Sequence, residues 1–293
     1  MNKILLLGNT GQVGWELNRT LLSLGELIAL DYPQVNMADP ASIRALVNET
    51  QPTLIINATA YTDVDRAEIE PDLARAINST GVKILAEEAQ NIHATLIHYS
   101  TDYVFDGAKG APYVETDTPN PLNVYGETKL CGERALESIG APYLIFRTSW
   151  VYSDRRPCFV TKVRQWARQH ETLRIVDDQV SSPTWARTLA EITAQIVAQG
   201  KGDLAGYLAD KSGIYHLAGG GYCSRYEWAQ AILDTDSHPE QQVVKKVLPA
   251  KSIDFPTPAL RPLISILDCK KIVNTFQLEL PDWKLCQSLI SQT

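Results

Sequence analysis

Short apolar runs recur along the chain, and each ends at a glycine or at polar residues. The first run, residues 3–7, stops at Gly8, and the second, residues 27–30, stops at Asp31. Runs of this length without polar alternation are typical of strands buried on both faces of a parallel sheet. The strands predicted in this way span residues 3–7, 27–30, 53–56, 94–99, 143–147, 173–176 and 214–218.

Helical periodicity fills the intervals between these runs. The polar stretch 200–213 has no such pattern and is predicted to be a surface loop, and the proline-rich stretch 251–262 is predicted to be a second loop. The predicted helices span residues 15–22, 42–49, 71–89, 159–168 and 184–198, with a further helix around Tyr125 that begins after the loop at 119–121.

Alternation of strands and helices predicts the α/β class, here a Rossmann-type doubly wound parallel sheet. A length of 293 residues is enough for two domains, or for one large α/β unit with a smaller C-terminal α/β lobe. We expect residues 1–152 to form the dinucleotide-binding domain, with parts of 172–218 returning to it. Residues 153–293 are expected to form mainly the substrate-binding lobe.

The composition is that of an ordinary globular protein, with 44% hydrophobic and 21% charged residues. A net charge of −7 without a basic run disfavours nucleic acid as a partner. The five cysteines are scattered and odd in number, which favours a reducing compartment. After Met1 the apolar run 4–7 is too short for a signal sequence or a membrane span, so we expect a cytoplasmic protein that does not contact a membrane.

A glycine-rich turn directly follows the first predicted strand and precedes the first predicted helix. Its glycines, Gly8, Gly11 and Gly14, are spaced G-x-x-G-x-x-G. Gly8 would allow the tight turn, Gly11 the approach of a pyrophosphate to the backbone, and Gly14 close packing of helix on strand. Free N–H groups at the helix start would then hold the phosphates. The context predicts a dinucleotide site, although a plain glycine turn remains the alternative.

Two further strand ends would contribute to the same site. Asp31 ends the second strand, where a carboxylate can bind the adenosine ribose hydroxyls and would repel a 2′-phosphate. No arginine follows it directly, which favours NADH over NADPH. The third strand ends in Asn57-Ala58-Thr59-Ala60, whose small side chains would let a cofactor pass close to the backbone.

Tyr125 and Lys129 lie four residues apart and therefore on one face of the predicted helix. A neighbouring ammonium lowers the pKa of a phenol, so this pair could exchange protons with a substrate at neutral pH. By itself the spacing is common and could be simple packing. Thr101 at the end of the fourth strand would lie at the ligand-binding edge of the sheet, beside this helix. Together with the glycine turn, the three residues predict an oxidoreductase site.

The sequence resembles the extended short-chain dehydrogenases/reductases, and within that superfamily the dTDP-4-dehydrorhamnose reductases. The resemblance covers nearly the whole chain. It departs from the usual pattern at Thr59, where a third small apolar residue is usual, and at Asn36-Met37, where an Asp usually precedes an apolar residue near the adenine. The stretches that carry it are residues 8–14, 62–68, 99–107, 125–129, 146–152, 178–179, 215–217 and 261–265.

The resemblance implies reduction of the 4-keto group of dTDP-4-dehydro-L-rhamnose (dTDP-6-deoxy-L-lyxo-4-hexulose) to dTDP-L-rhamnose by NADH or NADPH. Tyr125 would be the general acid. Lys129 would lower the pKa of Tyr125 and bind the nicotinamide ribose, and Thr101 would hydrogen-bond the substrate carbonyl oxygen.

The resemblance also implies the binding residues. Those for the cofactor are Gly8, Thr10, Gly11, Gln12, Val13, Gly14, Asp31, Asn36, Met37, Ala58, Thr59, Ala60, Tyr125 and Lys129. Those for the substrate are Thr62, Val64, Thr101, Tyr103, Trp150 and Arg261, of which Arg261 is the candidate for the diphosphate. For Tyr103 and Trp150 core packing is an equal alternative, and Arg147 could either meet a substrate phosphate or pair inside the protein.

Other functions on the same fold stay open. A sugar-nucleotide 4,6-dehydratase is disfavoured because related dehydratases place an Asp-Glu pair after the threonine, whereas Asp102 here is followed by Tyr103. An epimerase keeps the same Thr/Tyr/Lys set, and some relatives are non-catalytic cofactor-binding regulatory subunits. The resemblance allows a homodimer with Mg²⁺ held by glutamates at the interface, where Glu16 is a candidate.

Overall fold

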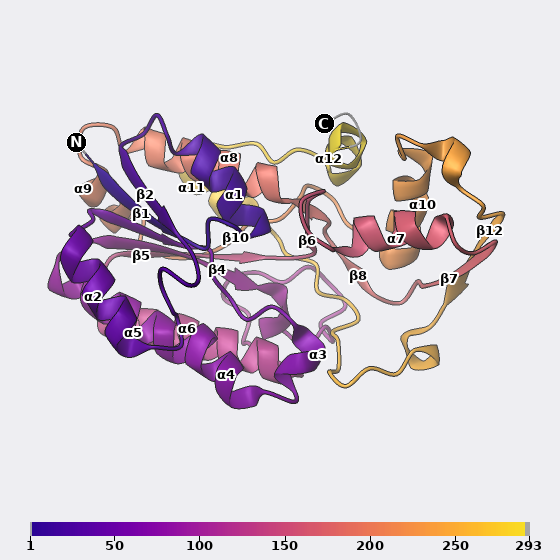
Figure 1. The fold of residues 1–293 in the computed structure, drawn as a ribbon, viewed down its shortest axis with the longest axis horizontal. Coiled ribbons are helices and arrows are strands. Elements are labelled where there is room, and N and C mark those ends of the chain that lie inside the picture. Colours follow the sequence, from indigo (N-terminus) through magenta and orange to yellow (C-terminus); the bar gives the residue numbers. More distant parts are fainter. Residues whose placement is uncertain (1, 291–293) are drawn as a thin grey trace.

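The computed structural model describes residues 2–290 and has a six-stranded parallel sheet at its centre (Figure 1). The strand order is β2-β1-β3-β4-β5-β10, with every neighbouring pair parallel. Chain order reverses between β1 and β3, which places the ligand-binding crevice beyond the carboxyl ends of these two strands. The strands are β1 (Lys3–Leu7), β2 (Glu26–Leu30), β3 (Leu54–Asn57), β4 (Thr95–Thr101), β5 (Tyr143–Thr148) and β10 (Gly213–His216).

Helices cover both faces of the sheet, because both faces of its strands are apolar (Figure 1). In β1, Ile4 and Leu6 enter one core, and Leu5 and Leu7 enter the other. The predicted doubly wound sheet is thus confirmed. The first core is covered by α1 (Gln12–Thr20), α8 (Ala186–Gln199), α9 (Leu204–Asp210) and α11 (Lys270–Phe276), and the second by α2 (Pro40–Thr50), α5 (Gly81–Asn91) and α6 (Val124–Ile139).

The helix predicted over 71–89 is divided by a π-helical turn. It consists of α4 (Pro71–Arg75), the π-turn η1 (Ala76–Thr80) and α5. The π-turn carries the buried Asn78, whose amide bonds both the N–H and the carbonyl of Tyr61 and the hydroxyl of Thr128 on α6. Such turns often occur at functional sites, and this one fixes the loop after β3 against α6.

A second lobe lies at the carboxyl edge of the sheet (Figure 1). Its separate core lies among α7 (Phe159–Ala167), α10 (Arg225–Asp234), α12 (Trp283–Ile290) and a parallel pair of strands, β7 (Thr172–Val176) and β12 (Lys246–Ala250). The predicted strand 173–176 therefore exists, but it pairs in this lobe. The short remaining elements are α3 (Val64–Ala67), β6 (Val151–Tyr152), β8 (Val180–Ser181), β9 (Thr184–Trp185), β11 (Cys223–Ser224) and the 3₁₀ turns η2 (Asp102–Val104), η3 (Pro239–Gln241) and η4 (Ser252–Asp254).

The prediction of a surface loop over residues 200–213 is wrong, because this stretch contains α9. The Asp203 carboxylate accepts a hydrogen bond from the N–H of Gly206 (2.9 Å) and so caps the helix. Leu204 and Leu208 of α9 are buried in the same core as α8. The two leucines lie four residues apart, so one helical face is apolar although the stretch as a whole is polar.

Candidate active site

A cavity of about 680 Å³ lies beyond the carboxyl ends of β1, β3 and β4. The glycine turn and the helix that carries Tyr125 both border this cavity. Of the predicted cofactor and catalytic residues, those that line it are Gly8, Thr10, Gly11, Gln12, Val13, Asp31, Ala58, Thr59, Ala60, Tyr125 and Lys129. The predicted substrate residue Thr62 lines it as well.

Close backbone packing explains the glycines of the turn. Gly8 has a φ of 86°, and a Cβ there would lie 2.9 Å from the carbonyl carbon of Ala58. A Cβ on Gly14 would lie 1.9 Å from the Gly8 oxygen, so only glycine lets α1 pack this closely on the turn. The first backbone N–H groups of α1 have no carbonyl of a preceding helical turn to bond. Gln12 and Val13 border the cavity at this end of the helix. This cradle fits the diphosphate of a dinucleotide.

The adenosine end of the cavity contains an arginine that the sequence did not indicate. Asp31 accepts hydrogen bonds from the Thr10 hydroxyl (2.5 Å) and the Thr10 N–H (3.2 Å). Arg156 donates to the Thr10 carbonyl and hydroxyl, both at 3.0 Å, and lines the same cavity. The positive charge lies beside Asp31 although it lies 125 residues further along the chain, and no local pattern could have revealed it.

Asn36 and Met37 are among the predicted cofactor residues but do not belong to the residues that line this cavity. Met37 packs in the second core, 6% exposed. The Asn36 carboxamide accepts a hydrogen bond from the N–H of Ala38 (3.0 Å). Their role in adenine binding stays a prediction.

Helix α6 is held at the end of β4 by contacts around its first turn. Asn123 caps it by accepting from the N–H of Gly126 (2.8 Å), and Glu68 accepts from the N–H of Val124 (2.8 Å). A Cβ on Gly126 would lie 2.2 Å from the backbone carbonyl oxygen of Tyr103, so glycine allows the helix to approach η2. These contacts place Tyr125 next to Tyr103, with ring centroids 5.9 Å apart and edge to face.

Thr101 lies beside the Tyr125 phenol, and Lys129 lines the same cavity as Tyr125 one helical turn further on α6. The Thr101 hydroxyl accepts from the N–H of Tyr103 (3.1 Å) and donates to Asp102 (3.2 Å). It also lies close enough to Tyr125 to lower the pKa of the phenol. The Lys129 ammonium or amine group is buried, 2.6 Å from the Tyr99 carbonyl and 3.0 Å from His98 Nε2.

The proton affinities at this site differ from the expectation that Lys129 lowers the pKa of Tyr125. Burial raises the pKa of Tyr125 above its usual range, and the Thr101 hydroxyl opposes this effect. Burial also lowers the pKa of Lys129 to about 7, against a raising effect of Glu133. At neutral pH the cofactor-free site thus holds a protonated phenol and a lysine whose amine and ammonium forms are both populated.

Asp102 is a second buried acid next to Thr101. It accepts hydrogen bonds from the hydroxyls of Ser265 (2.5 Å) and Ser181 (3.4 Å) in addition to Thr101. Burial raises the pKa of Asp102 to about 6. The acid is enclosed by serines that donate to it, and Tyr103 rather than a second acid follows it, which does not match the paired acids of a dehydratase.

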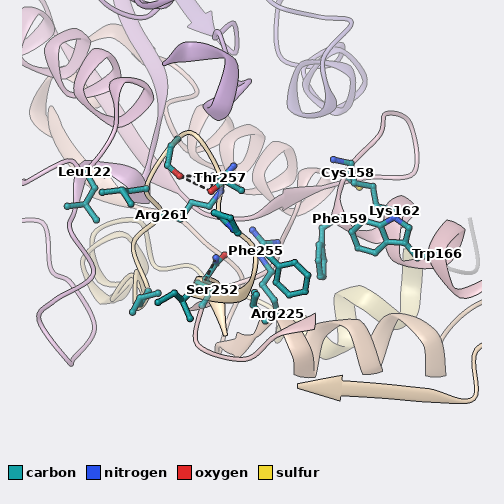
Figure 2. A pocket seen from close by; sticks show the side chains of 17 residues that line it. Leu122, Cys158, Phe159, Lys162, Trp166, Arg225, Ser252, Phe255, Thr257 and Arg261 are labelled. Atoms are coloured by element: carbon teal, nitrogen blue, oxygen red, sulfur yellow. Dashed lines mark hydrogen bonds between the residues drawn. The ribbon is translucent and has the colours of Figure 1, made fainter. Parts of the chain in front are cut away.

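A second cavity, of about 840 Å³, lies in the C-terminal lobe (Figure 2). It contains three cationic side chains, Lys162, Arg225 and Arg261, together with aromatic and aliphatic walls. Pro157 lines the first cavity and Cys158 the second, so the two cavities adjoin along the chain. The other lining residues include Phe159, Trp166, Phe255 and Leu263.

The arginines near the two cavities have different partners. Arg147 is 2% exposed and forms a buried pair with Glu133 (2.6 Å), which decides for internal pairing over a substrate phosphate. Arg261 is bidentate to Asp65, at 2.9 and 2.6 Å, and also donates to Thr257 (Figure 2). Its guanidinium is therefore largely engaged within the protein.

Arg225 is the unpaired guanidinium of the second cavity. Its guanidinium carbon lies 3.7 Å from the centre of the Trp150 ring and 4.7 Å from the centre of the Phe159 ring. Figure 2 shows Arg225 beside Phe159. Arg225 has no carboxylate partner within 4.0 Å among residues 2–290. Burial lowers the pKa of Arg225 to about 10, so it stays charged at neutral pH. Arg225 was not among the predicted site residues. Ser224 and Glu227 form a capping box, a sequence pattern that could have indicated the start of α10, where Arg225 lies.

For the remaining predicted substrate residues, the contacts are less direct evidence of substrate binding. Trp150 also stacks on Trp228, with centroids 5.5 Å apart, and so has both a packing contact and the contact with Arg225. Val64 begins α3 and is half-buried. Asp65 in the same turn is the partner of Arg261, which ties the loop after β3 to the second lobe.

The site around Glu16 does not fit a bound cation. The carboxylate is 6% exposed and lies 3.0 Å from Arg19 and 3.6 Å from Arg187. Two positive neighbours disfavour Mg²⁺ there. Within residues 2–290 there is no group of three or more His, Cys, Asp or Glu side chains that could hold a metal ion.

The sheet, the glycine turn and the Tyr-Lys helix define the class: the protein is a Rossmann-type oxidoreductase that uses NAD(P)H. A family model described as RmlD substrate binding domain matches residues 1–291. Similarity to dTDP-4-dehydrorhamnose reductase of Escherichia coli K12 is 42% identity over 289 residues, covering 96% of this chain and 94% of that protein. The chain belongs to the RmlD family, that of the dTDP-4-dehydrorhamnose reductases.

Solved structures agree with this assignment. A dTDP-4-dehydrorhamnose reductase of Clostridium acetobutylicum superposes with a TM-score of 0.89 at 32% identity, covering 99% of this chain and 98% of that one. The enzyme from Bacillus anthracis, solved in complex with NADP, has a TM-score of 0.88 at 30% identity with the same coverage. In the described part of the chain, no helix is both long and apolar enough to cross a membrane.

Proposed function

We propose that this protein reduces the 4-keto group of dTDP-4-dehydro-L-rhamnose to give dTDP-L-rhamnose, with NADH or NADPH as the reductant. The observation that carries the proposal is that Tyr125 and Lys129 line the cavity of the glycine turn, with the Thr101 side chain beside the Tyr125 phenol. The family to which the chain belongs supports the substrate.

The chain's own residues account for the steps around the ketone. The hydride for the reduction is the chemistry that a bound NADH or NADPH supplies, and the glycine turn, Asp31 and Lys129 would hold that cofactor. Tyr125 then gives its phenolic proton to the oxygen formed at C4, and Thr101 hydrogen-bonds the same oxygen. The raised pKa of Tyr125 keeps the proton in place until the oxygen becomes strongly basic.

The charges that line the second cavity support the proposal that the substrate is a sugar linked to a nucleoside diphosphate. Arg225 carries a charge without a carboxylate partner among residues 2–290, and Lys162 lines the same cavity. A diphosphate would supply the anionic oxygens that a guanidinium binds in pairs. We therefore assign the diphosphate contact to Arg225, with Arg261 as a neighbour whose bond to Asp65 orders the wall.

The finer expectations stay predictions. They include a homodimer, a cytoplasmic location, and a division into a dinucleotide-binding part, residues 1–152 with parts of 172–218, and a substrate-binding part. The cofactor preference is also open to measurement, since Arg156 lies beside Asp31 and changes the charge that a 2′-phosphate would meet. An epimerase and a regulatory subunit are the alternatives.

The test is oxidation of NADH and of NADPH with the 4-keto sugar nucleotide generated in place. Tyr125→Phe should bind cofactor normally and lose turnover by a factor of about 10²–10⁴, since only the proton donor is removed. Tyr207→Phe on α9, a tyrosine hydrogen-bonded to Gln199, is the matched control and should keep full activity. Cofactor binding without oxidation by the unmodified protein would favour the alternatives, and an active Tyr125→Phe would remove Tyr125 from the acid role.

A further inference from the structure

A line of buried hydrogen bonds connects the loop after β3 to Lys129. Asn57 and His98 are 0% exposed and Lys129 is 1% exposed. Asn57 Nδ2 lies 3.1 Å from His98 Nδ1, and His98 Nε2 lies 3.0 Å from Lys129 Nζ. Two donors facing each other in such a place would leave buried polar groups unsatisfied, so each contact needs one donor and one acceptor.

The backbone of Thr59 fixes the direction of this line. Its N–H lies 3.0 Å from Asn57 Oδ1, and its hydroxyl donates to the same oxygen at 2.5 Å. A backbone N–H can only donate, so the Asn57 atom that faces it must be the oxygen. The amide nitrogen of Asn57 therefore faces His98, and because it too can only donate, His98 Nδ1 must accept and carry no proton.

The position of the histidine proton then determines the state of Lys129. A neutral imidazole has one proton, which must lie on His98 Nε2, the atom that faces Lys129 Nζ. An ammonium has three donors and no acceptor, whereas a neutral amine has a lone pair to receive the Nε2 proton. The neutral amine still donates to the Tyr99 carbonyl at 2.6 Å. Only the neutral form of Lys129 satisfies every contact.

We propose that Asn57 and His98 are positioning residues that hold Lys129 as a neutral amine in the cofactor-free enzyme and thereby keep Tyr125 in its protonated, acidic form. A charged Lys129 would favour the phenolate, which is the form needed to oxidise an alcohol. A neutral Lys129 removes that influence and prepares the site for the reduction of a ketone.

The charges around the two groups are consistent with this assignment. Lys129 meets His98 from β4 and Glu133 from its own helix, and the charge of Glu133 is balanced by Arg147 from β5. Tyr125 meets Thr101 from β4 and Asp102 and Tyr103 from η2, and both η2 residues raise the pKa of the phenol. Burial lowers the pKa of His98 well below its usual range, so the ring is neutral at pH 7.

The first test reads the tautomer of His98 by nitrogen-15 NMR of the imidazole rings in the protein without substrate. We expect His98 to carry its proton on Nε2. His216 provides an internal reference of the opposite kind, because its Nδ1 lies 3.0 Å from the Tyr113 carbonyl and must be the protonated atom. His98→Gln assigns the signal. A His98 protonated on Nδ1, or on both nitrogens, at neutral pH would overturn the inference.

The second test reverses the line with a change of one atom. In Asn57→Asp the carboxylate accepts from both Thr59 and His98, which moves the His98 proton to Nδ1 and lets Nε2 accept from a charged Lys129. The alkaline limb of the pH profile of kcat/KM, where Tyr125 loses its proton, should then move down by about one pH unit or more. Asn274→Asp, an exposed residue of α11, makes the same change of charge and should not move the limb.

An unmoved limb, or an unchanged His98 tautomer, in Asn57→Asp would refute the inference. The kinetic arm rests on the proposed reductase function, but the tautomer does not. A protein with the expected His98 and His216 tautomers and no reductase activity would therefore refute the proposed function and support the inference about Lys129. If His98→Gln fails to fold, the ring signals that move in Asn57→Asp assign His98 instead.

Discussion

Replacing Arg225 by methionine removes one cation from the second cavity and keeps an unbranched apolar side chain against the same rings. Arg225 lies at the start of α10, with its guanidinium 3.7 Å from the centre of the Trp150 ring. Methionine contacts aromatic rings favourably, so the wall of the cavity should stay packed. The change therefore isolates the charge that we assign to the diphosphate.

The size of the effect follows from the state of the guanidinium. Its pKa of about 10 leaves it charged at neutral pH. Hydrogen bonds to a charged group contribute about 1.5–3 kcal/mol, and each 1.4 kcal/mol corresponds to a factor of ten in affinity. Loss of the contact should thus weaken binding of the sugar nucleotide by a factor of about 10–100.

Steady-state kinetics with each substrate varied in turn measures this effect. We expect KM for the sugar nucleotide to rise, with kcat and KM for NADH or NADPH changed by less than about threefold, because the diphosphate lies away from the reacting carbonyl and is bound equally in the ground and transition states. Arg134→Met removes the same charge from an exposed position on α6 and is the matched control.

Three results would contradict this reasoning. One is an unchanged KM for the sugar nucleotide, which would leave the diphosphate to Lys162 or Arg261. Another is an equal rise in KM for the cofactor, which would indicate a general disturbance between the lobes. The third is the same rise in Arg134→Met, which would assign the effect to net charge alone.

The remaining predictions concern the cofactor and the core. Asp31→Ala should weaken NADH by a factor of about 10–100 through loss of charged hydrogen bonds to the ribose, and NADPH by less; equal effects in a fluorescence titration would show that Asp31 does not contact the ribose. Glu133→Gln should lower the free energy of unfolding by about 3–5 kcal/mol, because Arg147 would remain buried without its charged partner. Urea unfolding measures this against Glu137→Gln, an exposed carboxylate one turn further on α6, and a loss below about 1 kcal/mol would argue that the pair is weakly coupled.

Local patterns were sufficient to predict most of the central sheet. Apolar runs such as residues 4–7 are short and uninterrupted, and this one is bounded by glycine; few structures other than a buried strand satisfy such a pattern. The same pattern could not show that the strand at 173–176 pairs with β12 in the second lobe, because pairing depends on which segment returns to it. The π-turn at Ala76–Thr80 was also hidden, since one added residue per turn barely changes an amphipathic pattern.

The site divides in the same way. Tyr125 and Lys129 were predictable because one helical turn brings them together. The glycine turn was predictable because its three glycines lie close together in the sequence, at positions 8, 11 and 14. Arg156 beside Asp31, and Arg225 against Trp150, meet only after the second lobe packs on the sheet. The Tyr125 pKa is raised, against the expected lowering, for a related reason: burial, which the sequence does not give, outweighs the lowering effect of the Thr101 hydroxyl.

Strand β10 and helices α8 and α11 complete the first core long after the other strands of the sheet have been made, and this order affects synthesis on the ribosome. The core that contains Ile4 and Leu6 also needs Leu189, Ile196 and Tyr215. About 70 residues separate the end of β5 from the end of β10. At a synthesis rate of about 5–20 residues per second, one edge and part of one face of the sheet therefore stay uncovered for about 4–14 s. A nascent chain of this protein therefore exposes apolar strand surface during that interval.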